Sequence, residues 1–283
     1  MNHLIGAINW IEGGYVIDSS LESLTVKAMD SGLEAAVFHI SNVESNFVLK
    51  VWNRTSKPNV ELQYKLLGAL YNHGISVSHP MGWGFDKEMN PVLLTSWDGV
   101  PVQKVNHSVF TSLANMLTGI HRVPIEQFDS FTLPRHDFIS YFYPAIEDHP
   151  DIKILLEQLV EDCDMKQERL IHGDFNLGNV LYADGKYTVI DWTNGQLGDP
   201  RYDIAWAVVL VRIYVGEKYG TIFQASFLAN DEYSIEELEL FEAIACLRWV
   251  LLYRIADLPK GKDTIKRVRN ILKRNKYLSE AFI

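Results

Sequence analysis

A short segment past the middle of the sequence carries polar residues whose types and spacing suggest chemistry. Asp174 follows His172 and Gly173. Asn179 comes five residues after Asp174, and Asp191 ends a second apolar stretch. Amide and carboxylate oxygens are hard ligands of the kind that Mg²⁺ takes together with substrate phosphates. The sequence therefore predicts magnesium ligands at Asn179 and Asp191, and a carboxylate at Asp174 that can accept a proton from a hydroxyl group.

The residues between these groups predict a β-hairpin that brings the two metal ligands together. Apolar strand patterns flank Asp184-Gly185, a dipeptide typical of two-residue hairpin turns. A turn centred there places Asn179 opposite the neighbourhood of Asp191. The alternative is that Asp174 only forms an Asx-turn and that Asp191 only ends an exposed strand.

The spacing of these residues is that of the kinase catalytic loop, in which the first Asp serves the acceptor hydroxyl and the Asn and later Asp hold magnesium. The segments HGDFNLGNVL, VIDW and GDPRYDIAW resemble the aminoglycoside phosphotransferase and choline kinase family, a branch of the protein-kinase-like fold. The resemblance covers most of the chain and is most specific from His172 to Ala205. It implies transfer of the γ-phosphoryl group of ATP or GTP, with Mg²⁺, to a hydroxyl group of a small molecule.

The resemblance also implies how the residues divide the work. Asp174 is expected to be the catalytic base, and Asn179 and Asp191 the magnesium ligands. Asp203 resembles the family's buried Asp that braces the catalytic loop, so we expect it to serve structure rather than chemistry. His121 resembles a helix-end histidine of the family, and we expect a structural role there too.

Nucleotide binding needs a cation in the N-terminal part of the chain, and Lys50 in FVLKVW is the best candidate. Strand alternation sends Lys50 to the face opposite its neighbours; the alternative is an exposed strand lysine. Glu61, at the family position on the next helix, is expected to orient the ammonium group. The alternative for Glu61 is an exposed pair with Lys65, one helical turn later.

Two further segments complete the expected nucleotide site. Ser31 and Gly32 lie in a turn between two predicted strands and are expected to approach the phosphates, although the chain has no Gly-x-Gly-x-x-Gly loop. Thr95, Ser96 and Trp97 fall where the family binds adenine through backbone N–H and C=O groups.

Hydrophobic periodicity predicts the elements that must position these residues. In the first third of the chain we expect a helix from Ser56 to His73 and strands over residues 24–29, 35–40, 46–52 and, as a hairpin, 82–97. Further on, helices are expected over residues 108–122, 152–162, 203–219, 234–256 and 262–277. This α+β pattern indicates two domains: a small antiparallel-sheet, nucleotide-binding lobe (1–97) and a mainly helical lobe with the catalytic loop and the acceptor pocket (98–283).

Composition narrows the class of protein and its partners. The 283 residues are 47% hydrophobic and carry a formal net charge of −10, which disfavours nucleic acid and anionic membranes as partners. The sequence has no basic leader and no run of about 18 apolar residues, so we expect a cytoplasmic protein. The two cysteines, Cys163 and Cys246, are expected to be buried free thiols.

The acceptor is expected to be a small molecule, because the eleven residues between Asp191 and Asp203 are too few for the peptide-docking segment of a protein kinase. Acidic residues on the helices expected around the pocket favour a cationic acceptor, unless they form a solvated face: Glu147, Asp148, Asp151, Glu236, Glu237, Glu239 and Glu242. The best candidate is an aminoglycoside-like antibiotic, with resistance as the role. The alternatives are a kinase for a macrolide, an amino alcohol or a sugar, and a catalytically silent binding protein.

Overall fold

A computed structural model describes residues 8–14, 24–29, 35–43, 45–56, 58–229 and 232–283. The chain divides into two compact units. The N unit comprises residues up to Pro101 together with 127–131 and 180–193, and the C unit comprises residues 102–126, 132–179 and 194–283. Residues 180–193 thus cluster with the N unit, although the sequence analysis placed them in the C-terminal lobe. The functional division at residue 97 stays a prediction.

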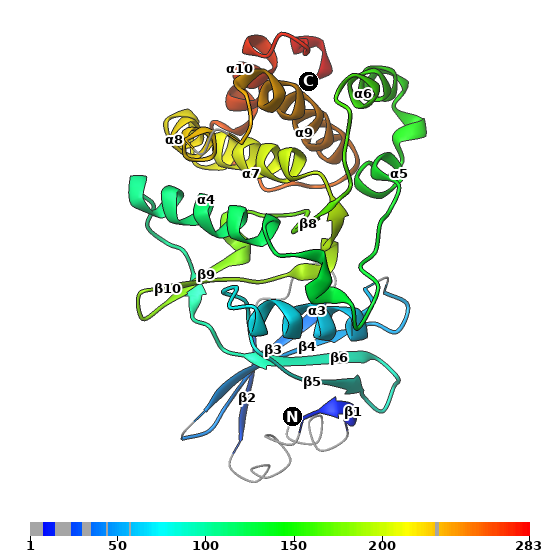
Figure 1. Ribbon diagram of the computed structural model, residues 1–283, viewed down its shortest axis with the longest axis vertical. Coiled ribbons are helices and arrows are strands. Elements are labelled where there is room, and N and C mark those ends of the chain that lie inside the picture. Colours follow the sequence, from blue (N-terminus) through cyan, green and yellow to red (C-terminus); the bar gives the residue numbers. More distant parts are fainter. Residues whose placement is uncertain (1–7, 15–23, 30–34, 44, 57, 230–231) are drawn as a thin grey trace. The chain divides into compact units, whose positions relative to one another are not determined.

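A six-stranded antiparallel sheet forms the body of the N unit (Figure 1), with strand order β1-β5-β6-β4-β3-β2. The strands are β1 (Asn9–Gly13), β2 (Thr25–Ala28), β3 (Ala35–Ser41), β4 (Asn46–Trp52), β5 (Pro80–Phe85) and β6 (Pro91–Ser96). Strands β2 to β6 confirm those expected from the sequence. The edge strand β1 was not expected.

The two faces of the sheet differ because side chains alternate along each strand. Phe47 and Leu49 of β4 are buried in an apolar cluster that includes Leu94 of β6. Lys50 pairs with Leu93 instead and lies on the opposite face. Helix α3 (Val60–Asn72) packs against β5 and β6 with residues outside this cluster, so it covers the face of Lys50.

The expected start of α3 at Ser56 is wrong. Asn59 caps the helix, its Oδ1 accepting a hydrogen bond from the backbone N–H of Leu62 at 2.9 Å. The expected end is confirmed, since the helix ends at Asn72, His73 is its C-cap and Gly74 follows with φ 86°.

The hairpin expected around Asp184-Gly185 is confirmed. Its strands are β9 (Val180–Ala183) and β10 (Lys186–Val189), and Val180 pairs with Val189. Asp184 and Gly185 have φ values of 49° and 83°, the left-handed conformations that a type I′ turn requires. Strand β9 also pairs with β7 (Val100–Pro101), so this small sheet is part of the N unit.

The C unit is mainly helical. Its helices are α4 (His107–His121), α5 (Phe138–Phe142), α6 (Pro150–Asp162), α7 (Pro200–Tyr214), α8 (Glu217–Leu228), α9 (Ile235–Ile255) and α10 (Thr264–Arg274). A two-stranded sheet joins β8 (Arg169–Ile171) to β11 (Gln196–Gly198). The helix expected over residues 203–219 is divided at Gly216, whose φ of 139° interrupts it.

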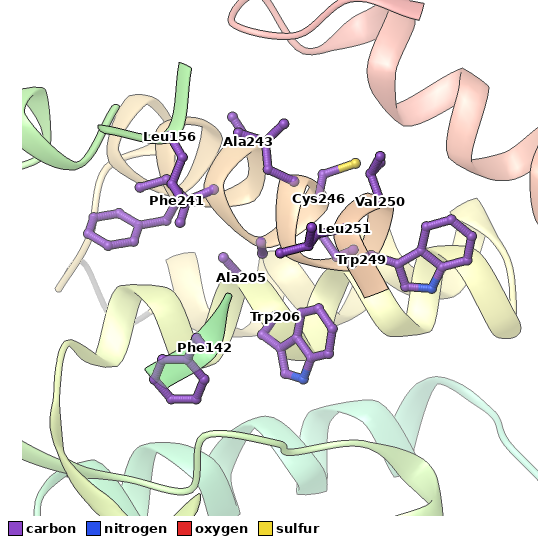
Figure 2. Packing of buried hydrophobic residues seen from close by; sticks show 14 of the residues in the cluster. Phe142, Leu156, Ala205, Trp206, Phe241, Ala243, Cys246, Trp249, Val250 and Leu251 are labelled. Carbon is purple, nitrogen blue, oxygen red and sulfur yellow. The ribbon is translucent and has the colours of Figure 1, made fainter. Parts of the chain in front are cut away.

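Helix α9 lies at the centre of the C-unit core and packs against α7 (Figure 2). A helix that is apolar on most sides is typical of such a position. Both cysteines, Cys163 and Cys246, are free and buried, as expected. Burial raises the pKa of the Cys163 thiol to about 11 and that of Cys246 still further. None of the helices in the described residues combines the length and the hydropathy of a membrane span.

Candidate active site

Asp174 lies in the loop between β8 and β9, and side chains of the C unit fix its carboxylate. The indole N–H of Trp206 donates a hydrogen bond to Oδ1 at 2.8 Å. The side-chain amides of Asn176 and Asn179 approach Oδ2 at 3.3 Å each, and both donate to the backbone carbonyl of Asp174, at 3.0 and 2.9 Å. These contacts hold the acidic group in one orientation.

Asp203 of α7 braces the same loop through its backbone, as predicted. Its carboxylate is fully buried and accepts hydrogen bonds from the backbone N–H groups of His172 (2.8 Å) and Gly173 (2.9 Å). His121, at the end of α4, lies 3.0 Å away through Nε2, which confirms its structural role. Burial alone would raise the pKa of Asp203, but the hydrogen bonds from His121 and the loop amides hold it below its usual value.

Gly173 gives the loop a conformation that other residues would strain. Its φ is 77°, and a Cβ added there would lie 2.8 Å from Cβ and 2.9 Å from the backbone O of Asn194. Only glycine adopts this backbone without steric cost. The turn that presents Asp174 therefore depends on this residue.

Lys50 and Asp191 form an ion pair inside the N unit, with Nζ 3.7 Å from Oδ1. Asp191 follows β10 and has a left-handed φ of 65°, unusual for a residue other than glycine. Thr193 donates a hydrogen bond to Asp191 Oδ1 at 3.0 Å. Two residues predicted independently, the phosphate-binding cation and a magnesium ligand, are thus brought together.

The expected pair between Lys50 and Glu61 is not formed. Glu61 accepts a 2.6 Å bond from Lys65 on the exposed side of α3, which was the alternative interpretation. The polar residue on the buried side is Gln63, 5% exposed, whose Nε2 has no hydrogen-bond partner among the described residues. Sequence reasoning missed Gln63, although it falls in the apolar stripe that runs from Val60 along the helix.

The other residues expected to bind nucleotide fall in two segments, residues 31–32 and residues 95–97. Ser31 and Gly32 fall outside the described residues. Thr95 and Ser96 end β6, and Trp97 follows. The backbone N–H groups of Ser96 and Trp97 donate to the carbonyls of His79 (2.9 Å) and Asn46 (3.3 Å) within the N unit, so a base bound here would be held by other groups of the segment.

Most of the acidic residues expected to attract a cationic acceptor are engaged within the C unit. The pairs are Glu147–Lys153 (2.6 Å), Asp151–Arg254 (2.8 Å), Glu237–Arg201 (3.0 Å), Glu239–Lys276 (3.1 Å) and Glu242–Arg274 (2.8 Å). Partners of opposite charge cancel much of the field that these carboxylates would exert on a ligand. The helices therefore give less support to a cationic acceptor than their composition suggests.

The chemistry of Asn179 and Asp191 suits a magnesium ion. The Asn179 amide nitrogen is used on Asp174, which leaves its carbonyl oxygen as a possible metal ligand. Asp191 adds a carboxylate. Groups of three or more His, Cys, Asp or Glu arranged to hold a metal do not occur in the described part of the chain. Asn179 belongs to the C unit and Asp191 to the N unit, and a magnesium ion bound to either oxygen would take its remaining ligands mainly from phosphates and water.

Comparisons with known proteins identify the family and the fold. The model of the phosphotransferase enzyme family matches residues 25–241. The comparison with curated protein sequences found no significant match.

Three solved structures represent the structural neighbours. An ethanolamine kinase of Plasmodium vivax is 15% identical, over 92% of this chain and 85% of that one, with a TM-score of 0.64. A thermostable mutant of aminoglycoside phosphotransferase APH(4)-Ia, in ternary complex with AMP-PNP and hygromycin B, is 16% identical, over 92% and 97%, with a TM-score of 0.62. Amicoumacin kinase hAmiN is 17% identical, over 91% and 90%, with a TM-score of 0.61. The expected α+β, protein-kinase-like fold is confirmed, and the chain belongs to the phosphotransferase enzyme family.

Proposed function

We propose that this protein is a small-molecule kinase that transfers the γ-phosphoryl group of ATP or GTP to a hydroxyl group, with an aminoglycoside-like antibiotic as the first acceptor to test. The observation that carries the proposal is the fixed carboxylate of Asp174, held by Trp206, Asn176 and Asn179 on a loop braced by Asp203. A family whose members transfer phosphate needs such a base beside the acceptor.

Each residue has a defined part in the proposed reaction. The acceptor oxygen bonds to the γ-phosphorus as the bond from that phosphorus to the β-phosphate oxygen breaks, and the hydroxyl proton passes to Asp174. Lys50 of the N unit binds the α- and β-phosphates. Asn179 and Asp191 would hold Mg²⁺, which neutralises charge on the β- and γ-phosphates when bound.

The proposed acceptor class rests on the family of this chain and on the solved structures that it resembles. The APH(4)-Ia structure is a ternary complex with AMP-PNP and hygromycin B, and amicoumacin kinase hAmiN was solved in complex with AMP-PNP, Ca²⁺ and Ami. The ethanolamine kinase keeps an amino alcohol in the search. An amino alcohol is a cation at neutral pH, so cationic acceptors come first in spite of the ion pairs in the C unit. A kinase that consumes ATP would work in the cytoplasm, the location expected from the sequence.

The decisive experiment is a phosphorylation screen of antibiotics, amino alcohols and sugars with MgATP and MgGTP, read by the added mass of phosphate. Asp174→Asn is the control. It should keep nucleotide affinity and lose about 10²- to 10⁴-fold in turnover, the usual share of a general base. Equal losses of nucleotide affinity and turnover would show that Asp174 has a different role.

Nucleotide binding can be tested without an acceptor. MgATP should raise the melting temperature by mass action, since only the folded protein binds it. Asp191→Ala should remove the magnesium-dependent part of this rise and still give a folded protein, because the Asp191 side chain is 44% exposed. If wild-type protein shows no rise at millimolar MgATP, the kinase proposal fails and the silent binding protein replaces it.

A further inference from the structure

We infer that Trp206 and Arg248 act together as positioning residues for Asp174: the Trp206 indole orients the carboxylate, and Arg248 fixes both the indole and the loop backbone. This inference rests on the proposed function only in naming Asp174 as the base. The contacts themselves lie within the C unit.

Of the three hydrogen bonds to the Asp174 carboxylate, the one from Trp206 is the shortest. Trp206 is 3% exposed, and its bond to Oδ1 is 2.8 Å long, whereas the two amides approach Oδ2 at 3.3 Å. A hydrogen bond to a charged acceptor is stronger than a neutral one. With Oδ1 committed to the indole, the geometry leaves Oδ2 as the oxygen that accepts the proton.

One helical turn of α7 supplies both supports of the loop. Asp203 and Trp206 are three residues apart and so lie on neighbouring positions of the same helix face. Asp203 binds the loop through backbone N–H groups, and Trp206 binds it through the carboxylate of Asp174. Any rotation of α7 would therefore move the base together with its backbone.

Arg248 reaches the same place from α9. Its guanidinium carbon lies 4.1 Å from the ring centroid of Trp206 and 4.6 Å from that of Phe142, so the charge makes cation–π contacts with both rings. Nη1 donates to the carbonyl of Gly173 and to the hydroxyl of Tyr202, at 3.0 Å each. Figure 2 places Trp206 and Phe142 near each other in this core.

Burying the charge of Arg248 costs free energy unless other groups compensate it. The side chain is 8% exposed, and within the described residues no carboxylate lies at ion-pair distance and Nε has no partner. Burial alone would lower the pKa of Arg248, but its neighbours, Tyr202 first and then Asp174, raise it overall. The guanidinium thus stays charged while it holds the Gly173 carbonyl of the loop.

The first test needs no acceptor. In a ¹H–¹⁵N spectrum the seven tryptophans give separate indole signals, and Trp206→Phe identifies the one that belongs to Trp206. That signal should shift in Asp174→Asn, because the charged acceptor becomes neutral, and its hydrogen exchange should speed up in Arg248→Met. If the chemical shift of the Trp206 indole is the same in Asp174→Asn and its exchange rate is the same in Arg248→Met, the inference is overturned.

The second test separates positioning from folding. Trp206→Phe should lower kcat about 10- to 100-fold, the worth of a hydrogen bond to a charged group, and leave the KM for MgATP unchanged. Trp249→Phe is the matched control: Trp249 is 1% exposed, and its indole N–H donates to Tyr214 at 3.0 Å, away from Asp174. Arg248→Lys, which keeps the charge, should retain more activity than Arg248→Met.

Equal effects of Trp206→Phe and Trp249→Phe on kcat would reduce Trp206 to a packing residue and overturn the inference. If the wild-type protein transfers no phosphate to any acceptor in the screen, the proposed function fails, yet the indole signals still decide whether Trp206 and Arg248 hold Asp174.

Discussion

At the scale of single residues, the buried polar side chain of α3 is the amide of Gln63, whereas kinases pair the phosphate-binding lysine with a glutamate from the helix. Gln63 is buried on the face of α3 that packs against the sheet, and Lys50 lies on the sheet face that α3 covers. Lys50 is paired instead with Asp191. Without a carboxylate from α3, Asp191 must both accompany Lys50 and serve as a proposed magnesium ligand.

Replacing Gln63 by glutamate should therefore give Lys50 a second partner. We expect Gln63→Glu and Lys50→Met to be coupled by about 0.5–3 kcal/mol in a double-mutant cycle on the free energy of unfolding. A buried glutamate with its lysine removed loses its compensation, which is the physical reason for the coupling. Glu61→Gln is the control, because breaking its exposed pair with Lys65 should cost less than about 1 kcal/mol. Additive effects of Gln63→Glu and Lys50→Met would place the two side chains out of contact.

The sequence predicted individual residues well where strand alternation or a local motif decides their position, and less well where a helix rotates about its axis. Lys50 was found because its strand neighbours are apolar. Glu61 was chosen because it stands at the family position on the helix, and the way the helix faces was not used in the choice. The stripe of α3 contains Gln63, so its period was the better guide.

At the scale of elements, α7 supplies Asp203, which holds the backbone of the catalytic loop. The contribution of Asp203 to the free energy of unfolding should depend on pH. The pKa of Asp203 is lowered in the folded protein. Its carboxylate therefore stabilises the fold at pH values above its unfolded pKa of about 3.9, and this stabilisation is lost as pH falls through the lower folded pKa.

We expect Asp203→Asn to cost on the order of 3 kcal/mol at neutral pH and progressively less below about pH 4, as measured by urea unfolding at a series of pH values. Asp151→Asn is a suitable comparison, since the pKa of Asp151 is also lowered, first by its hydrogen bonds from Arg254, but its side chain is 50% exposed. That change should cost less than about 1 kcal/mol. A pH-independent cost for Asp203→Asn would contradict the role of its charge.

An element could be predicted from the sequence where residues close together in the chain determine it. The β9–β10 hairpin could be placed to the residue because Asp184 and Gly185 fix both the turn and the pairing of Val180 with Val189. The start of α3 could not, since Ser56 and Asn59 are both good caps and packing decides between them. Among the described residues the edge strand β1 pairs with β5, which lies about 70 residues further along the chain, so its partner is not a neighbour in the sequence.

At the scale of the whole molecule, the net charge of −10 and the ion pairs of the C unit act on a ligand in different ways. The net charge acts at long range and speeds the encounter with cations. The paired carboxylates act weakly even at short range, because Lys153 or Arg254 accompanies them. Glu236 and Asp148 carry no such partner within the described residues.

For a cationic acceptor, kcat/KM should therefore fall as salt rises, because the Debye length shrinks from about 10 Å at 0.1 M to about 3 Å at 1 M. Asp148→Asn should lower kcat/KM at low salt more than Glu147→Gln does, since Glu147 is already neutralised by Lys153. A best acceptor that is anionic, or a rate indifferent to salt, would remove the cationic part of the proposal and leave phosphoryl transfer untouched.

The two buried thiols should react slowly with thiol-directed labels. Only a thiolate reacts with thiol-directed labels, and both Cys163 and Cys246 are buried with raised pKa values. A cysteine introduced at an exposed position, such as Val43 (99% exposed) in the N unit or Ile154 (69%) in the C unit, would then be the reactive one. Spin labels on Val43→Cys and Ile154→Cys would report the separation of the two units with and without MgATP, in a chain whose own cysteines need no replacement.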